Sequence, residues 1–242
     1  MLMAWLFYGG FAIFLCGLGY RLFVYTSTPV PLKIPTTPAP LTPSGVVFRM
    51  IREVCLFESL FKANLWTWIF GAMFHFGLLL VFIRHLRYVM QPVWSWVNLM
   101  QPLGVYGGML MIVGLSGLWA RRIFVERIRY ISTPSDHLML VLLLCIGCSG
   151  LLLKFFVHPD IVGIKNFVQG WLMFDAGVFP KENGLFIHLG LVLILMVIFP
   201  FSKLLHAPGV FFSPTRNQMD NSREKRHLTS WAKSLDEEGF HG

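Results

Sequence analysis

The sequence predicts an all-α integral membrane protein, a bundle of five transmembrane helices. Of its 242 residues, 55% are hydrophobic and only 13% are charged, and the mean hydropathy is +0.64. The chain also contains five runs close to the roughly 20 apolar residues that cross a bilayer as a helix. We place these spans at residues 3–23, 65–83, 102–120, 138–157 and 185–205.

The first apolar run is expected to remain as a span. It has no basic segment before it, it is longer than the apolar core of a signal peptide, and no small-residue cleavage site precedes Arg21. With five spans the two termini lie on opposite sides of the membrane. Of the 20 Lys and Arg residues, fifteen fall on the side of the C-terminus and five on the other. The positive-inside rule therefore predicts an N-terminus outside, in the periplasm, and a C-terminus in the cytoplasm.

The segments outside the spans carry further predictions. Residues 26–45 contain six prolines, too many for a helix, and predict an extended cytoplasmic strap. Residues 46–61 alternate apolar and charged residues at helical spacing, which favours an amphipathic helix at the membrane interface. The sequence specifies no fold for the outer loop at 158–184. Residues 1–206 thus form the membrane domain, and residues 207–242 form a cytoplasmic tail that docks a partner.

Glycines are concentrated in the third span. Gly104 and Gly108 form a G-x-x-x-G, and Gly107, Gly114 and Gly117 lie nearby. Such small residues let two helices, or a helix and a flat cofactor, approach closely. We favour helix packing as their role.

Composition and motifs disfavour three classes of function. No basic stripe interleaves with aromatic residues, so no nucleic-acid partner is expected. Cys145 and Cys148 form a C-x-x-C, but Ser149 follows in place of His, which argues against covalent c-type haem. The absence of an inverted repeat and of acidic residues in the span cores disfavours a channel or carrier.

Four histidines lie on two of the predicted spans. His75 and His85 belong to the second, and His188 and His206 belong to the fifth or its end. Ionisable groups at membrane depth are functional candidates, although a single membrane histidine is as often a packed, hydrogen-bonded residue. A b-type haem in a helix bundle takes two histidines from facing helices at matching depth. Because spans two and five run antiparallel, the sequence predicts an outer pair, His85 with His188, and an inner pair, His75 with His206.

The spacing of these histidines is compatible with two stacked haems. At about 1.5 Å per residue, His75 and His85 are roughly 15 Å apart, and His188 and His206 roughly 27 Å apart along one straight helix. The two values differ, and we expect helix tilt and a bend at Pro200 to absorb the difference.

Basic residues flank both predicted pairs. Arg84 and Arg87 lie by the outer pair, and Arg121, Arg122 and Lys203 lie by the inner one. They are candidates for binding haem propionates. They are equally consistent with ordinary boundary cations that extend to the membrane surface.

The strings that carry these residues resemble the respiratory nitrate reductase gamma-subunit family. They are FPFSKLLH at the end of span five, FHFGLLLVFIRH in span two, and SDHLML at the start of span four. Two further strings, KIPTTPAPLTPSG and HAPGVFFSPTRNQMDNSREKRH, resemble the DsrM branch of that family, the membrane cytochromes of the Dsr (DsrMKJOP) complexes of sulfur metabolism.

This resemblance implies cofactors and partners. It implies two haem b, a quinone or quinol substrate, and residence in the cytoplasmic (inner) membrane of a bacterium or archaeon. It further implies a cytoplasmic iron–sulfur subunit of the heterodisulfide-reductase type (DsrK) and other Dsr subunits, including a periplasmic multihaem cytochrome c. The nitrate reductase relatives carry a quinol-site lysine at the outer start of span three, where this chain has Gln101. Gln101 and Lys154 are therefore the candidates for the quinone site.

The sequence thus predicts an electron-transfer subunit of a quinone-linked oxidoreductase complex, with no covalent chemistry of its own. Two alternatives remain open at this stage. One is a haem-free membrane anchor of a cytoplasmic redox enzyme. The other is a gamma-type subunit of a different respiratory complex.

Overall fold

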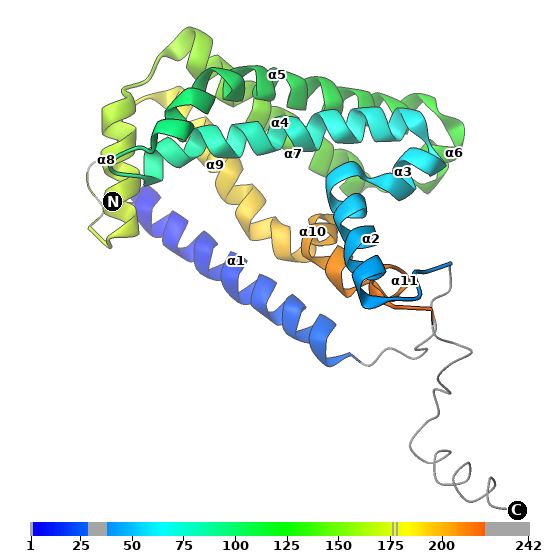
Figure 1. Ribbon diagram of the computed structural model, residues 1–242. Coiled ribbons are helices and arrows are strands. Elements are labelled where there is room, and N and C mark those ends of the chain that lie inside the picture. Colours follow the sequence, from blue (N-terminus) through cyan, green and yellow to red (C-terminus); the bar gives the residue numbers. More distant parts are fainter. Residues whose placement is uncertain (1, 29–37, 176, 178, 221–242) are drawn as a thin grey trace, which may run out of the picture. The chain divides into compact units, whose positions relative to one another are not determined.

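The computed structural model describes residues 2–28, 38–175, 177 and 179–220. In this part of the chain five helical segments are long and apolar enough to cross a membrane (Figure 1), which confirms the predicted number of spans. They are α1 (Leu2–Ser27), α4 (Leu65–Val89), α5 (Ser95–Phe124), α7 (Pro134–Leu152) with a π turn (Leu153–Val157), and α9 (Asn183–Ile198) with a 3-10 turn (Phe199–Phe201).

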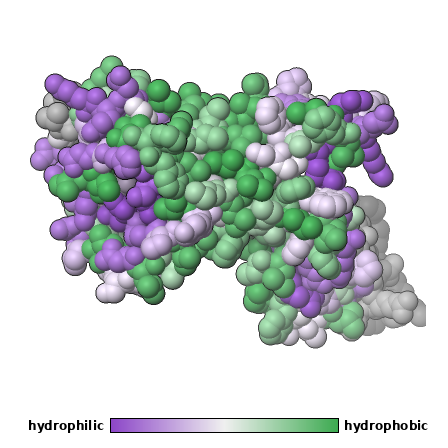
Figure 2. All heavy atoms as spheres, turned by 90° about the horizontal axis from the view of Figure 1, so that it is seen from above, coloured by the Kyte–Doolittle hydropathy of each residue, from purple (hydrophilic) through white to green (hydrophobic). Residues whose placement is uncertain are grey.

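The helices differ from the predicted spans mainly at their ends. Helix α4 continues six residues past position 83 and α5 begins seven residues before position 102, so His85 and Gln101 both lie on helices. Hydrophobic residues form a band over the long helices, with hydrophilic residues beside it (Figure 2). Exposed apolar side chains of this kind suit a lipid environment, where they lose nothing by remaining outside the protein core.

Close contact between α4 and α5 depends on glycine. A Cβ added at Gly77 would lie 2.5 Å from the carbonyl oxygen of Gly107, and one added at Gly114 would lie 2.6 Å from the backbone nitrogen of Phe74. No side chain fits at such distances, so these glycines let the two backbones touch. Helix packing is therefore what Gly107 and Gly114 provide.

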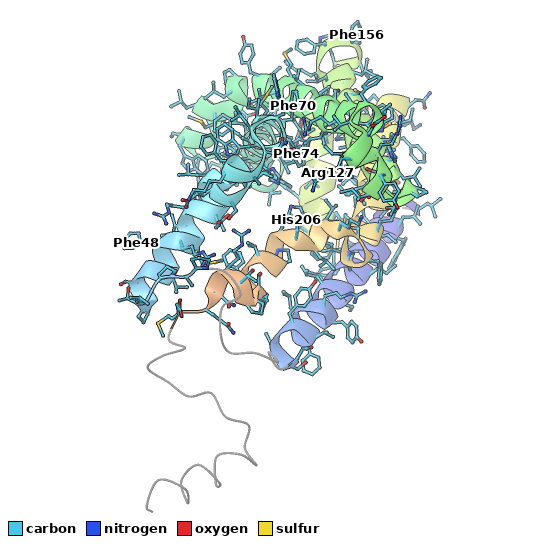
Figure 3. All side chains as sticks on the ribbon, turned by 90° about the vertical axis from the view of Figure 1, so that its right-hand side faces the viewer. Phe48, Phe70, Phe74, Arg127, Phe156 and His206 are labelled. Atoms are coloured by element: carbon cyan, nitrogen blue, oxygen red, sulfur yellow. The ribbon has the colours of Figure 1, made fainter. Side chains whose placement is uncertain are left out.

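A hydrophobic core lies beside this crossing. It consists of Phe74 of α4 with Met111 and Leu115 of α5, and Leu140, Leu143 and Leu144 of α7 pack against it. Phe74 is buried among these helices, whereas Phe156, in the π turn after α7, points away from them (Figure 3). These contacts hold α4, α5 and α7 together as the bundle that presents the candidate site.

The loop between α7 and α9 contains a helix that the sequence did not specify. Helix α8 (Ile161–Leu172) begins after Asp160, whose Oδ1 accepts a hydrogen bond from the backbone N–H of Val162 at 2.9 Å. Its buried residue Ile164 packs in a second core with Leu153 and Leu185. Helix α8 thus anchors the loop between α7 and α9.

The chain divides into two compact units. The first comprises Met1–Gly19 and Phe57–Lys203, and the second comprises Tyr20–Leu56 and Leu204–Gly242. In the second unit, α2 (Pro43–Leu56) packs with α11 (Pro214–Asn217), and Glu53 forms an ion pair with Arg216. This contact joins two segments that are far apart in the sequence.

The predicted amphipathic helix at 46–61 is broken in two. Helix α2 ends at Leu56, Phe57 has a left-handed backbone (φ 52°), and α3 (Glu58–Ala63) follows. The prediction of one continuous helix through this segment is therefore wrong, because the left-handed backbone of Phe57 interrupts the helix. Two short helices complete the described elements: α6 (Glu126–Ile131) and α10 (His206–Gly209).

Parts of the predicted strap and tail lie outside the described residues. These parts are residues 29–37 and 221–242. Of the strap, α1 includes positions 26 and 27, and of the tail, residues 207–220 form α10, a 3-10 turn (Val210–Phe212) and α11.

Candidate functional site

The structure places His85 and His188 within electrostatic range of each other. His85 lies on α4 and His188 on α9, and their imidazoles are close enough to interact electrostatically. A Cβ added at Gly150 of α7 would lie 3.3 Å from Cε1 of His188. The predicted outer pair is thus a neighbouring pair in the fold, with a glycine beside one ring.

Two histidines of α4 share the same hydrogen bond. Nδ1 of His75 is 2.8 Å from the carbonyl oxygen of Gly71, and Nδ1 of His85 is 2.7 Å from that of Val81. A carbonyl only accepts, so Nδ1 carries the proton in both rings. In the neutral imidazole Nε2 then keeps its lone pair, which is the arrangement of a metal-ligating histidine.

Nδ1 of His188 is hydrogen-bonded to a serine side chain. Oγ of Ser149 donates to the carbonyl oxygen of Ile146 at 3.0 Å and is 2.9 Å from Nδ1 of His188. Nδ1 of His188, like Nδ1 of His75 and of His85, is therefore hydrogen-bonded to an oxygen of the protein.

The inner pair divides between the two units. His75 is half-buried in the first unit, with the rings of Phe57 and Phe74 at 4.9 and 4.7 Å. His206 belongs to the second unit, where it is exposed at the start of α10 (Figure 3). Their pairing stays a prediction.

The predicted straight ladder from His188 to His206 is wrong beyond position 201. Helix α9 ends at Ile198, Pro200 lies in a 3-10 turn, and Ser202 is extended (φ −110°, ψ 170°). Pro200 lacks the N–H that a continuing helix needs. The bend is thus where we expected it, but the spacing of about 27 Å along one helix does not apply.

Gln101 lies in a polar cluster between the C-terminal end of α4 and the N-terminal part of α5. Nη1 of Arg84 donates to the carbonyl oxygen of Gln101 at 2.5 Å, and Nη1 of Arg87 donates to its Oε1 at 3.2 Å. Nε2 of Gln101 donates to the carbonyl oxygens of Arg84 and Val97 at 3.3 and 3.1 Å. Gln101, the first quinone candidate, therefore forms one cluster with Arg84 and Arg87, the two propionate candidates predicted for the outer pair. Lys154, the second quinone candidate, lies elsewhere, exposed in the π turn after α7.

Arg121 keeps one hydrogen-bonding group unused. Its Nη2 donates to Oδ1 of Asn64 at 3.1 Å, whereas its Nε is buried without a partner among the described residues. A buried N–H group without an acceptor is costly. Arg121 therefore fits the predicted role of binding an anionic group.

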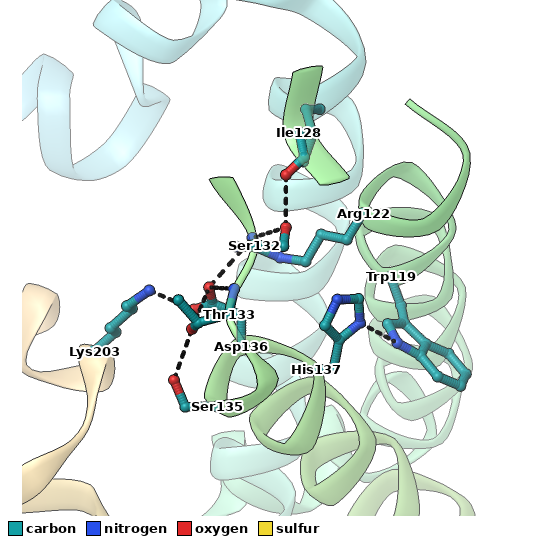
Figure 4. Close-up of polar contacts among 9 residues, drawn as sticks. All are labelled: Trp119, Arg122, Ile128, Ser132, Thr133, Ser135, Asp136, His137 and Lys203. Atoms are coloured by element: carbon teal, nitrogen blue, oxygen red, sulfur yellow. Dashed lines mark hydrogen bonds and ion pairs between the residues drawn. The ribbon is translucent and has the colours of Figure 1, made fainter. Parts of the chain in front are cut away.

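Arg122 and Lys203 instead converge on an acid that the sequence analysis did not single out. Asp136 is 7% exposed, and its Oδ1 lies 2.7 Å from Nζ of Lys203 (Figure 4). Arg122 lies 3.7 Å from Oδ2 and donates to Oγ of Ser132 at 3.0 Å. The T-P-S-D pattern that starts α7 is a capping-box signal and was the feature that could have identified Asp136.

The other histidines are less suited to bind iron. Nε1 of Trp119 donates to Nδ1 of His137 at 3.2 Å, so the proton of the neutral ring is on Nε2. His158 is exposed after the π turn with a left-handed backbone (φ 51°). His227 and His241 lie outside the described residues.

Comparison with known proteins identifies the family. Residues 59–221 match the model of the nitrate reductase gamma subunit. The chain belongs to this family. Among its relatives, the Hdr-like menaquinol oxidoreductase cytochrome b-like subunit of Archaeoglobus fulgidus is 36% identical over 91% of this chain and 80% of the relative. That of Archaeoglobus profundus is 35% identical over the same shares. The respiratory nitrate reductase 2 gamma chain of Escherichia coli is 30% identical over 64% of this chain and 77% of the relative.

Membership of the nitrate reductase gamma family accounts for the membrane architecture. The matched region begins in α3 and includes α4, α5, α7 and α9. It also contains all four predicted histidine ligands. The chain is therefore a multi-pass membrane protein of this family.

Proposed function

We propose that this protein is a dihaem b-type cytochrome subunit that carries electrons between the quinone pool and a cytoplasmic iron–sulfur partner. The observation that carries the proposal is the hydrogen bonding of the histidines at Nδ1. Nδ1 of His75 and Nδ1 of His85 each donate to a backbone carbonyl oxygen, Nδ1 of His188 is hydrogen-bonded to Ser149, and His85 and His188 lie within electrostatic range of each other. A hydrogen bond at Nδ1 holds an axial histidine in one tautomer and one orientation.

The residues have separate roles in this proposal. Nε2 of His85 and His188 would hold the outer haem, and Nε2 of His75 and His206 the inner one. Bound haem supplies one-electron transfer at a potential set by its ligands and surroundings. Arg84 and Arg87 at the outer end and Arg121 at the inner end offer cationic donors for propionates. Arg122 and Lys203 carry two positive charges and Asp136 carries one negative charge. One positive charge therefore remains to bind a propionate.

The quinone site is proposed at the Gln101 cluster. Gln101 has both ends of its amide held by α4 and by its own helix, so the group is fixed in orientation. Arg84 and Arg87 provide further donors for a quinone carbonyl. The Archaeoglobus relatives are called menaquinol oxidoreductase subunits, and we therefore propose a menaquinone-type substrate.

The branch of the family is proposed from the same relatives. They match over 91% of the chain, against 64% for the Escherichia coli gamma chain, and their names contain "Hdr-like". This supports a DsrM-type subunit with an iron–sulfur partner of the DsrK type, other Dsr subunits including a multihaem cytochrome c, and a role in sulfur metabolism. We further propose that the N-terminus faces the periplasm and that the tail docks the iron–sulfur partner.

A haem count on the purified protein tests the proposal. We expect two b haems per chain by pyridine haemochrome and two components in a redox titration. His85→Ala and His188→Ala should each lose the same component, and His75→Ala and His206→Ala the other. His137→Ala is the matched control and should keep both, because its Nδ1 is already an acceptor. A parent protein without haem, expressed with sufficient haem supply, would contradict the proposal in favour of a haem-free anchor.

A further inference from the structure

Helix α8 lies at one end of the bundle in the first unit. It contacts α4 beside the C-terminal end of that helix (Figure 1). Nζ of Lys165, on α8, donates to Oε1 of Gln91, which follows α4 in the chain. Connecting segments normally run over the surface of a protein with few apolar contacts. The segment between α7 and α9 differs, because it folds into a helix that is held against the bundle.

The inward face of α8 is apolar and buried. Ile164 is 6% exposed and Phe167 is 5% exposed. Ile164 belongs to the second core, together with Leu153 in the π turn after α7 and Leu185 of α9. Tyr88 of α4 packs against the same core. Ile164 therefore joins the ends of three transmembrane segments around one group of apolar side chains.

The second core lies beside the two histidines of the predicted outer pair. The rings of Tyr88 and His85 have their centroids 5.9 Å apart. On α9, Leu185 lies three residues before His188, which is nearly one helical turn. Leu189 follows His188 directly and also packs against the core. Each histidine is thus next to residues that contact the second core.

Tyr88 also contacts the polar cluster of Gln101. The guanidinium carbon of Arg87 lies 5.1 Å from the centroid of the Tyr88 ring, and Nη1 of Arg87 donates to Oε1 of Gln101 at 3.2 Å. Tyr88 therefore lies at the boundary between the apolar second core and a charged, hydrogen-bonded cluster.

We propose that α8, through Ile164, excludes water from the outer haem and thereby raises its reduction potential. Ferric haem carries one more positive charge than ferrous haem, and a charge is less stable in apolar surroundings than in water. Apolar burial therefore favours the reduced form. Ile164 acts through Tyr88 and Leu185 and makes no contact with the iron. This inference rests on the proposed function, because it assumes that His85 and His188 hold a haem.

Two polar substitutions on the inward face of α8 test this role. Ile164→Asn places an amide in the second core, and Val168→Asn does so at a half-buried position that packs against it. The outer haem is defined as the redox component that His188→Ala loses. We expect its midpoint potential to fall in both variants. We also expect its EPR signal to relax faster with an aqueous dysprosium chelate, because water comes closer to the iron. The inner haem should not change in either measurement.

Two further variants control for general damage to α8. Val162→Asn places the same amide on the same helix, but Val162 is 66% exposed, so both haems should keep the parent values. Ile164→Val keeps an apolar, branched side chain in the core and should also retain them. Ile164→Asn decides where it folds. If it does not fold, Val168→Asn decides, because its side chain is only partly buried.

The outcomes separate this inference from the proposed function. Two haems in the parent, with an unchanged potential and relaxation of the outer haem in the deciding variant, would overturn the role of α8 and leave the dihaem proposal intact. Equal shifts of both haems, or an equal shift in Val162→Asn, would indicate a general effect and would also overturn it. A parent with no haem, or a His188→Ala variant that keeps both haems, would overturn the two proposals together.

Discussion

The histidines acquire their chemistry from partners at Nδ1. For His75 and His85 the partner is a carbonyl one turn earlier on the same helix, so helical geometry alone provides it. For His188 the partner is Ser149 on α7, 39 positions away in the sequence. The contact at Nδ1 thus arises from local structure in His75 and His85 and from packing between helices in His188.

Replacing Ser149 tests this role of packing. Ser149→Ala removes the hydrogen-bonding partner of Nδ1 of His188, so the ring loses the contact that fixes its tautomer. Loss of such an outer partner typically weakens a metal site by about 10–100-fold. We expect a loss of outer-haem affinity in this range, measured by haem transfer to apomyoglobin. Ser135→Ala, which removes a hydroxyl near the inner end, should not alter outer-haem affinity. Equal retention of the outer haem in both variants would contradict the assignment.

Gln101 gives a second prediction at the residue scale. Gln101→Ala removes the amide that Arg87 and the Arg84 carbonyl hold, and with it a fixed donor and acceptor for quinol. One hydrogen bond to a charged group contributes about 1.5 kcal/mol or more, roughly tenfold in rate. We expect haem reduction by a menaquinol analogue, followed by stopped-flow absorbance, to slow by about that factor, with haem content unchanged. Asn98→Ala, at an exposed position of the same helix, is the control. An unchanged rate would place the quinol elsewhere.

At the scale of elements, α4 and α5 pack closely because the residues at their contact are glycines, which have no side chain. Gly77, Gly107 and Gly114 allow contact between backbones, and this contact carries Arg84, His85 and Gln101 on one pair of helices. In lipid, where apolar surfaces gain little from burial, close van der Waals contact is what stabilises such a crossing.

Adding one methyl group at this crossing should destabilise the protein. In Gly114→Ala the new Cβ would lie 2.6 Å from the backbone nitrogen of Phe74, and backbone atoms cannot rotate away. Overpacking of this kind costs about 1–3 kcal/mol. We expect a lower thermal midpoint in detergent, followed by haem absorbance and circular dichroism. Gly190→Ala, where an added Cβ meets nothing within 4 Å, should be neutral or stabilising by about 0.5–1 kcal/mol. A similar midpoint for both variants would rule out the glycine contact as a source of stability.

For the whole molecule, the distribution of charge predicts the orientation in the membrane. Fifteen of the 20 Lys and Arg residues lie on the side of the C-terminus, and the rule places that side in the cytoplasm. We expect a green fluorescent protein fused at the C-terminus to fluoresce. Alkaline phosphatase should be inactive at that position and active when fused in the outer loop after residue 175. The reverse pattern would invert the proposed path of electrons.

The five spans, the break in the last helix at Pro200 and the family could be predicted from the amino-acid sequence, and the four histidine ligands stay a prediction. These features depend on local properties. A run of apolar residues crosses the membrane because the transfer of its side chains into the bilayer is favourable, and proline interrupts a helix because it has no backbone N–H. Contacts between residues on different helices could be seen only in the structure. Only packing brought Ser149 to His188, Arg84 and Arg87 to Gln101, and Lys203 to Asp136. A sequence pattern states which residues lie on a helix, whereas the partner that each one meets depends on which faces of distant helices come together.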